Sequence, residues 1–253
     1  MSNLAPAAEA SVKIITFLAN CEHETGISEI SRGTGINKNM VFRILNTLEN
    51  EGWVYCNDQK YSLTLSLFGL ASKPLSRLSL NTAATPILYD LLNKTGESTY
   101  LGILNDDKVL YLQHLDGVKR VRVAGSIGGQ YDLYCSAPGK VLLAHADNDF
   151  IEEYTSRNFE KTTKNTITEK ADMLKELENI RINGYATDKE EFGNGITCVA
   201  APIYDYTGKV IAAVGCSAFT SSGQCEEIIK TLLHDILKSA KEISTRLGGA
   251  TAF

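Results

Sequence analysis

The clearest pattern of hydrophobic and polar positions lies between residues 27 and 53. Apolar residues recur there at helical spacing, at Val41, Ile44, Leu45 and Leu48. A helix with this spacing buries one face and leaves the other polar. Asn37 stands where an N-cap belongs, Gly35 suits a sharp turn from a preceding helix, and a strand begins near Trp53. The order helix, turn, helix, strand predicts a winged helix-turn-helix, and therefore DNA binding.

The polar face of the second helix carries side chains that suit DNA. Lysine and arginine favour phosphates, and side-chain amides can pair with adenine edges. Cations on the preceding turn and on the wing extend this surface. The predicted DNA-contacting residues are Arg32, Lys38, Asn39, Met40, Phe42, Arg43, Asn46 and Lys60.

Two flanking segments complete the small domain. A helix from about Ala7 to Cys21 has apolar residues at helical spacing and can cover its core. Residues 53–56 and 60–65 alternate as two short strands around Asn57-Asp58-Gln59, which has the chemistry of a hairpin turn. A three-helix packing unit without DNA binding is the alternative interpretation.

Bulk charge does not favour DNA binding. Residues 1–65 contain five Lys or Arg and seven Asp or Glu, a formal net charge of −2, where a basic domain is typical. The cations nevertheless gather on the predicted turn, recognition helix and wing. With few phosphate contacts, a single copy of the domain is expected to bind DNA weakly. Useful affinity would need two or more copies on repeated half-sites.

The chain is long enough for two domains. At 253 residues it can hold a small and a large domain of ordinary size. We predict the DNA-binding domain over residues 1–65, a linker helix over 66–80 that Pro74 ends or kinks, and a larger domain over 81–253.

Composition excludes several classes of protein. Hydrophobic content is 43% and charged content 22%, and no apolar run reaches the roughly 20 residues that span a membrane. No export signal is visible at the N-terminus, so a cytoplasmic protein is expected. Six scattered cysteines show no metal-ligand spacing and suit small buried residues, with a redox or metal sensor as the alternative. No phosphate-binding loop occurs, and no cofactor is predicted.

The larger domain mixes helices with antiparallel strands. Strands joined by a two-residue turn, as at Asp106-Asp107, are antiparallel. Thr168 is the expected N-cap of the longest central helix and Gly184 its stop. The expected helices span about 81–94, 138–146, 149–156, 169–183 and 224–247, and the strands about 97–105, 108–115, 120–124, 196–204 and 209–218. This pattern predicts an α+β domain on an antiparallel sheet.

The whole chain resembles the IclR family of bacterial transcriptional regulators. The resemblance rests on FRILNTLENEGWV and YSLTLSLFGL in the first domain, YDLYCSAPGKVLLA at residues 131–144, and GYATDKEEFGNGITCVAAPIYDYTGKVIAAV at residues 184–214. It implies a GAF-like effector-binding domain over 81–253 and a homodimer or homotetramer that grips double-stranded operator DNA. Family members often carry Ser-Thr where this chain has Asn39-Met40, so the operator sequence does not transfer.

The resemblance also implies a small-molecule effector pocket. The positions that match it are Val123, Tyr131, Ala137, Pro138, Gly139, Asp188, Glu190, Cys198, Gly215 and Ser217. Backbone donors at the helix start near Pro138-Gly139 suit a carboxylate. Asp188 and Glu190 would repel an anion unless they contact hydroxyls or are themselves paired, which favours an organic or sugar acid with hydroxyls, or a neutral ligand. Gly215, where the family frequently has serine, is expected to enlarge the pocket.

Two other functions remain open at this point. The larger domain could be a hydrolase that uses Cys135 or Cys198, although no base and orienting group are visible to activate either thiol. An architectural DNA-binding protein would leave the large second domain unexplained. We therefore predict a DNA-binding transcriptional regulator, with a cysteine hydrolase as the alternative.

Overall fold

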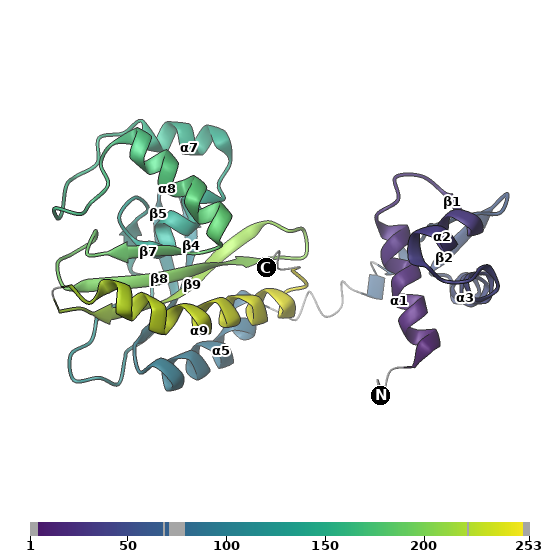
Figure 1. Ribbon diagram of the computed structural model, residues 1–253, viewed down its shortest axis with the longest axis horizontal. Helices are drawn as coiled ribbons and strands as arrows, with labels where there is room; N and C mark the ends of the chain where they lie inside the picture. Colours follow the sequence, from purple (N-terminus) through teal and green to yellow (C-terminus); the bar gives the residue numbers. More distant parts are fainter. Residues whose placement is uncertain (1–4, 68, 71–78, 222, 250–253) are drawn as a thin grey trace. The chain divides into compact units, whose positions relative to one another are not determined.

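The computed structural model describes residues 5–67, 69–70, 79–221 and 223–249. The chain forms two compact units that divide between residues 77 and 78, and each is described by itself (Figure 1). Of the predicted linker helix, Ser66, Leu67, Gly69 and Leu70 have helical backbone. Residues 68 and 71–78, with the predicted break at Pro74, lie outside the described residues. Ser79 and Leu80 are the N-cap and the first residue of the next helix, α5 (Leu80–Thr95).

The N-terminal unit is a winged helix-turn-helix. Its helices are α1 (Pro6–Ala19), α2 (Ile27–Thr34) and α3 (Lys38–Asn50), and its strands are β1 (Thr25–Gly26), β2 (Val54–Asn57) and β3 (Lys60–Leu63). The strands form an antiparallel sheet in the order β1-β3-β2. The predicted stripe on α3 is buried and packs against α1, α2 and the sheet in one core.

Local signals at the turn act as predicted. The Asn37 side-chain oxygen accepts the Met40 backbone N–H at 2.9 Å and caps α3. Gly35 ends α2 with a φ of 71°, a left-handed conformation that glycine adopts without a steric penalty. These two residues fix the angle at which α3 leaves the turn.

The wing turn is tighter than predicted. Asn57 pairs with Lys60, which leaves only Asp58 and Gln59 in the loop. Their φ values are 46° and 61°, as a two-residue type I′ hairpin requires. β1, which pairs with β3, was not predicted because two residues are too few to show an alternating pattern.

The C-terminal unit is built on one antiparallel sheet. Its helices are α5 (Leu80–Thr95), α6 (Ala137–Ala144), α7 (Asn148–Thr155), α8 (Lys170–Asn183) and α9 (Cys225–Arg246). Its strands are β4 (Ser98–Asn105), β5 (Lys108–Leu115), β6 (Gln130–Asp132), β7 (Ala186–Lys189), β8 (Ile196–Tyr204) and β9 (Val210–Phe219). The strand order is β6-β5-β4-β9-β8-β7. The α+β class predicted from sequence is confirmed.

Helices cover both faces of this sheet (Figure 1). α5 and α9 lie on one face and bury apolar residues of β4, β8 and β9. α6 lies on the other face, with α7 and α8 outside it. The central strands are therefore buried on both sides, which explains their nearly continuous apolar sequences.

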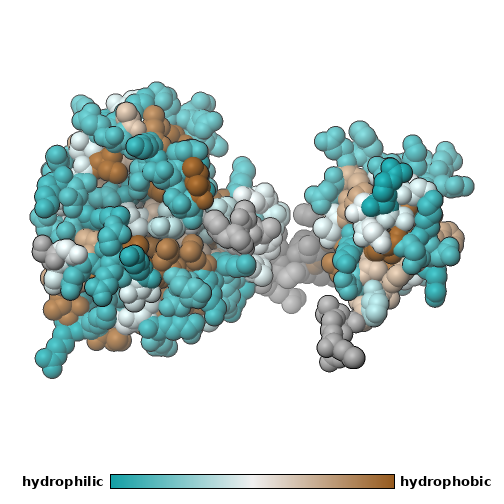
Figure 2. Space-filling view, in the orientation of Figure 1, coloured by the Kyte–Doolittle hydropathy of each residue, from teal (hydrophilic) through white to brown (hydrophobic). Residues whose placement is uncertain are grey.

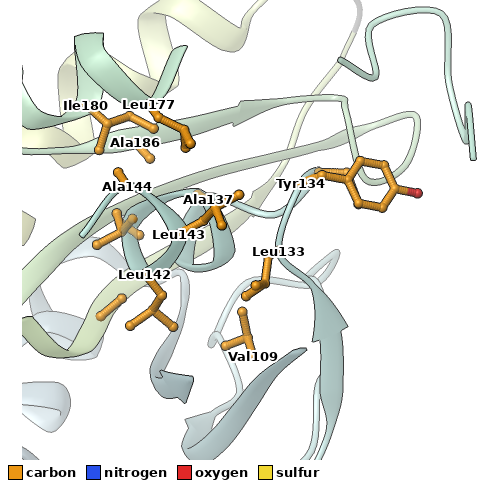
Figure 3. Close-up of a cluster of buried hydrophobic side chains, with 14 of the residues drawn as sticks. Val109, Leu133, Tyr134, Ala137, Leu142, Leu143, Ala144, Leu177, Ile180 and Ala186 are labelled. Carbon is orange, nitrogen blue, oxygen red and sulfur yellow. The ribbon is translucent and has the colours of Figure 1, made fainter. Parts of the chain in front are cut away.

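α6 is the most enclosed helix of the described chain. All eight of its residues, including Lys140, are buried. Figure 3 shows Leu142, Leu143 and Ala144 of α6 among side chains from the sheet and from α8. A Cβ on Gly139 would lie 2.5 Å from the Leu133 Cα, so only glycine lets α6 pack this closely on the preceding loop.

The strand predicted at Arg120–Ala124 is wrong. That segment is irregular, and β5 pairs instead with β6. Tyr111 of β5 also exchanges backbone hydrogen bonds with Gly128 and Gly129. The outer edge of β5 is therefore already occupied, and no partner strand is left for residues 120–124.

Two details of the remaining elements differ from prediction. The N-cap of α8 is Glu169 without a side-chain hydrogen bond, not Thr168. β7 was not predicted, because its four residues (ATDK) are mostly polar. Gly184 does end α8, with a φ of 75°.

Within the described residues, no helix is both long and apolar enough to cross a bilayer. The face seen in Figure 2 is mostly hydrophilic, with small scattered apolar patches.

Gly215 of β9 tests how tightly the central sheet is packed. We expect Gly215→Ala to destabilise the C-terminal unit by roughly 1–3 kcal/mol, because overpacking forces neighbours to move. The added Cβ would overlap the Val199 carbonyl oxygen and lie 2.6 Å from the hydroxyl oxygen of buried Tyr100. Urea unfolding of the purified variant measures the change.

Gly193→Ala is the matched control. There the nearest atom to an added Cβ is the Ile196 Cδ1 at 3.5 Å, an ordinary contact, so its stability should stay near that of the wild type. Equal midpoints for the two variants would contradict the packing argument.

Candidate DNA-contacting face and buried cavity

The exposed face of α3 carries most of the predicted DNA-contacting residues. Lys38, Asn39, Phe42, Arg43 and Asn46 are all exposed, opposite the buried stripe of the same helix. Phe42, a large apolar residue, is 47% exposed on the same face. The helix therefore presents two cations, two amides and one aromatic ring to solvent.

Among the described residues, the four predicted DNA-contacting cations have no carboxylate partner, unlike Lys13 of α1, which pairs with Glu9 at 2.7 Å. Arg32 is exposed at the end of α2 and Lys60 at the start of β3. Within the part of the chain that the structure describes, none of Arg32, Lys38, Arg43 and Lys60 forms an ion pair. A cation without a carboxylate partner does not have to break an ion pair before it contacts a phosphate.

Met40 differs from the rest of this set. Met40 is half-buried and packs against the core of the N-terminal unit, beside the stripe residue Val41. Its side chain is therefore part of the helix packing, and its backbone N–H is taken by Asn37.

The C-terminal unit contains a cavity of about 90 Å³ on the α6 side of the sheet. It lies where β5 and β9 end and β8 begins. Of the ten positions predicted for the effector pocket, six line it: Val123, Tyr131, Pro138, Asp188, Cys198 and Ser217. Seven other residues complete the wall: Tyr111, His114, Ala124, Gly125, Ser136, Phe192 and Ile196.

Aromatic rings form one side of the cavity. Tyr131 lies 4.4 Å from Tyr111 and 5.9 Å from Phe192 between ring centroids. The imidazole of His114 stacks on Tyr111 at 6.0 Å. The wall can therefore pack against a flat or apolar part of a ligand.

The opposite side is polar and centres on Asp188. One carboxylate oxygen, Oδ1, accepts the backbone N–H groups of Glu191 (2.6 Å) and Phe192 (3.2 Å). The other, Oδ2, is buried with no hydrogen-bond partner among the described residues. Burial, with the nearby charge of Glu191, raises the pKa of Asp188 from 3.8 to about 7. Cys198 and Ser217 lie beside it, with 3.1 Å between Sγ and Oγ.

Four predicted pocket residues do not line the cavity. Ala137 is fully buried in the core beneath it. Glu190 instead accepts the Gly195 backbone N–H at 2.8 Å and shapes the loop after β7. The predicted enlargement at Gly215 is wrong, because the Tyr100 side chain occupies that space.

Gly139, at the start of α6, is the fourth predicted pocket residue that does not line the cavity. This helix start offers fewer free backbone donors than expected. Pro138 has no N–H, and the Gly139 N–H donates to the Ser136 hydroxyl at 3.2 Å. The Lys140 N–H donates to the Ser136 carbonyl. Ser136 thus serves as the N-cap of α6, so any anion here would depend more on side chains than on backbone donors.

A buried ion cluster holds the polar wall in place. The Lys140 ammonium lies 2.6 and 2.7 Å from the two carboxylate oxygens of Glu191 and 3.3 Å from Glu176 of α8. Burial lowers the pKa of Lys140, but the carboxylates of Glu191 and Glu176 more than offset this, so the pKa lies above its usual value. Lys140 therefore stays charged and fixes the loop that carries Glu191.

Comparison with known proteins decides the family. The family model described as bacterial transcriptional regulator IclR C-terminal matches residues 72–245. The IclR helix-turn-helix domain matches residues 7–58. The chain belongs to the IclR family.

Relatives of known name agree with this family membership. The transcriptional regulator KdgR of Escherichia coli K12 is 34% identical over 230 residues, which cover 90% of this chain and 87% of KdgR. The crystal structure of Thermotoga maritima IclR is 29% identical, with a TM-score of 0.63 over 95% of this chain and 98% of that one. An IclR homologue from Microbacterium hydrocarbonoxydans, solved with 4-hydroxybenzoate, shares the fold at 22% identity and a TM-score of 0.61, over 95% and 98% of the two chains.

This IclR-family protein is a DNA-binding transcriptional regulator with a C-terminal effector domain, and its named relatives are regulators rather than enzymes. The hydrolase alternative also fails on chemistry. Burial raises the pKa of the Cys135 thiol to about 12 and that of Cys198 well above its usual value. Both thiols therefore stay protonated and are poor nucleophiles. No group of metal-ligating side chains occurs among the residues that the structure describes.

The cavity residues missed from sequence differ in how they could have been found. Alternation along β5 places Tyr111 on the same side as Val109, facing α6, so a stricter use of strand periodicity would have included it. Phe192, by contrast, lies in the irregular loop after β7, where no periodic pattern exists.

Asp188 should make the stability of the IclR effector domain depend on pH. An unfolded aspartate carboxyl ionises near its ordinary pKa of 3.8, whereas the folded one has a pKa of about 7. The stability that the protonated Asp188 carboxyl contributes is thus fully present below the unfolded pKa, and it is lost as pH rises through the folded pKa. Asp188→Asn cannot ionise and so does not show this loss. The free energy of unfolding of the variant minus that of the wild type should therefore rise by roughly 2–3 kcal/mol between about pH 5 and pH 8.

Urea unfolding at several pH values measures this difference. The absolute stability of the variant also includes any change in the bonds to Glu191 and Phe192, so the trend with pH is the diagnostic quantity. A difference that stays constant across this range would show that Asp188 ionises normally in the folded protein.

Proposed function

We propose that a small hydroxylated organic acid, bound in the cavity beside Asp188, controls operator binding by this IclR-family regulator. The observation that carries this proposal is the buried Asp188 Oδ2, which has no hydrogen-bond partner among the described residues. Such an atom is costly to bury unless a ligand satisfies it.

The chemistry of Asp188 suits a ligand with both hydroxyl and carboxylate groups. With a pKa of about 7, Asp188 is present in both protonation states near neutral pH. The ionised form accepts a hydrogen bond from a ligand hydroxyl, and the protonated form can donate one to a carboxylate. A ligand acid is therefore tolerated here, in contrast to the repulsion that an ordinary aspartate would exert.

The other walls support the same class of ligand. The Ser217 hydroxyl can bond a ligand carboxylate or hydroxyl, and the aromatic rings can pack against its carbon frame, whereas the Ser136 hydroxyl already donates to the Asp132 carbonyl and accepts the Gly139 N–H. The compact cavity favours a small molecule. One relative of the same fold was solved with 4-hydroxybenzoate, a hydroxylated acid. A sugar acid satisfies the same polar groups, and a neutral polyol is the second candidate.

We infer that the DNA-contacting set is Arg32, Lys38, Asn39, Phe42, Arg43, Asn46 and Lys60. Their exposure and the lack of ion pairs among the four cations support this assignment. Four phosphate-binding cations give one unit little affinity, so we also propose that a homodimer or homotetramer places two or more units on a repeated or palindromic site.

Substitutions on α3 test the DNA-contacting set. Arg43→Ala and Asn39→Ala should each weaken binding to a site selected from random DNA by roughly 1–3 kcal/mol if they contact bases. Neither change creates a cavity, because both side chains are exposed. Gel-shift titration at fixed salt measures the affinity.

Asn50→Ala is the matched control for these variants. Asn50 is exposed at the opposite end of α3, so its removal should leave affinity unchanged. If Arg43→Ala and Asn39→Ala bind as tightly as Asn50→Ala, α3 does not read DNA through this face.

Ser217→Ala tests the effector site. A thermal-shift screen of hydroxylated acids, including 4-hydroxybenzoate and sugar acids, identifies a ligand that stabilises the full-length protein. Calorimetry should then show that Ser217→Ala lowers affinity for it by roughly 0.5–1.5 kcal/mol, the usual worth of one hydrogen bond.

Ser126→Ala is the control, because Ser126 is exposed in the loop before β6 and does not line the cavity. Equal affinity of the wild type and both variants would place the ligand elsewhere. A screen in which only neutral polyols bind would overturn the acid assignment and favour the second candidate.

A further inference from the structure

One wall of the effector cavity is an irregular segment between β5 and β6. Residues 116–129 have no regular secondary structure. Val123, Ala124 and Gly125, in the middle of this segment, line the cavity. We call residues 118–128 the strap. It covers one side of the cavity without the support of a strand ladder or a helix.

The other walls of the cavity are better anchored. Their residues belong to strands, to α6 or to its N-cap, with Phe192 as the exception. The Phe192 backbone N–H donates to Asp188, and the preceding residue, Glu191, is paired with Lys140. A ligand that needs more room would therefore displace the strap before any other wall.

Backbone hydrogen bonds fix the two ends of the strap. Val118 donates to the Gly96 carbonyl at 3.1 Å, and Gly128 donates to the Tyr111 carbonyl at 2.8 Å. Between these two bonds, a single backbone group of the strap is hydrogen-bonded to a residue outside it in the described part of the chain. The middle of the strap is thus held mainly by that one bond.

Apolar contacts do not replace the missing backbone bonds. Val118, Val121 and Ile127 are 77%, 58% and 70% exposed. Within the described effector domain, no strap residue belongs to either hydrophobic cluster. Lys119 also pairs with Glu97, but the lysine side chain is 54% exposed, and an ion pair with an exposed member contributes little.

The one bond in the middle of the strap comes from Ser98, the first residue of β4. Its hydroxyl donates to the Val123 carbonyl at 2.7 Å and accepts the Gly117 N–H at 2.9 Å. Ser98 pairs in register with Ser217 of β9, and residues paired directly across antiparallel strands share a face. Because Ser217 lines the cavity, the bond that holds the strap lies beside the proposed ligand site.

The cavity is small for the ligands considered above. Its volume is about 90 Å³, whereas a protein cavity of about 150 Å³ is known to hold one benzene molecule. A hydroxybenzoate is a benzene ring with two polar substituents, and a sugar acid is of similar or larger size. Either ligand requires one wall to move outward.

We propose that the strap is a gate over the effector cavity and that the Ser98 hydroxyl holds it closed. The proposal rests on the effector function proposed above, which requires a ligand to enter. The strap moves outward about its bonded ends at Val118 and Gly128, and the Val123 carbonyl then accepts a hydrogen bond from water instead of Ser98. Opening breaks one hydrogen bond and exposes little apolar surface, so it occurs without unfolding of the sheet.

The labelling rate of Cys198 tests the gate without any ligand. Cys198 lines the cavity and is buried while the strap is closed. Methyl methanethiosulfonate, a small thiol reagent, should therefore modify it in proportion to the open population. Ser98→Ala should raise this rate roughly three- to tenfold, the usual effect of one lost hydrogen bond. Ser98→Cys, which keeps the size of the side chain but donates weakly, should show a smaller increase. Peptide mass spectrometry follows each cysteine separately.

Cys216 and Ser126→Ala are the controls. Cys216 is buried on the opposite face of the sheet, among residues of α5 and α9, so its labelling reports unfolding of the sheet and should not change in Ser98→Ala. Ser126 is exposed in the strap, and Ser126→Ala leaves the Ser98 bond in place, so Cys198 should label there as in the wild type. Equal increases at Cys198 and Cys216 in Ser98→Ala, or no increase at Cys198, would overturn the proposal.

Wild-type protein in low urea gives a second measurement that needs no variant. Gate opening exposes little surface, so Cys198 labelling should hardly respond to urea below the unfolding midpoint, whereas Cys216 labelling should rise steeply. A steep rise at both cysteines means that Cys198 is reached only by unfolding and that the strap is not a gate. These rates involve no ligand. If the thermal-shift screen finds no acid but Cys198 labels as expected, the effector assignment fails and the gate remains.

Discussion

The buried charge of Lys140 is the constraint on which much of the effector domain depends. An ammonium group enclosed on all sides is strongly destabilising unless carboxylates neutralise it at close range. Glu191 does so with both oxygens and Glu176 with one. The cluster therefore joins three elements that are distant in sequence: α6, α8 and the loop after β7. None of the three can move far without exposing an unpaired buried charge.

The effector cavity follows from this arrangement. Glu191 is held by Lys140, and the backbone N–H of the same residue donates to Asp188, so the ion cluster also sets the position of the Asp188 carboxylate. Gly139 allows α6 to approach the preceding loop, and Ser136 caps the helix beside the cavity. A site for a small ligand thus rests on one charged cluster and one close helix contact, not on flexible loops alone.

Sequence predicted the elements with strong local signals. The stripe on α3, its cap at Asn37 and the main strand hairpins depend on residues within a few positions of each other, and all are confirmed. Prediction failed where distant segments compete. Residues 120–124 look like a strand, but the edge of β5 is taken by Gln130–Asp132. Gly215 looks like empty space, but Tyr100 from a neighbouring strand fills it. The cavity wall was only partly predictable for the same reason, because Phe192 enters it through a tertiary contact with Tyr131.

The short outer strands of the effector sheet bear on how copies of the protein can associate. β6 has three residues and β7 has four, whereas the four strands between them have eight to ten. Long unpaired edges act as templates for strands of other chains, and short edges are a known protection against that form of aggregation. Here few backbone groups remain to extend the sheet from one molecule into the next. The two edges of the effector sheet therefore protect the protein against open-ended growth by strand addition.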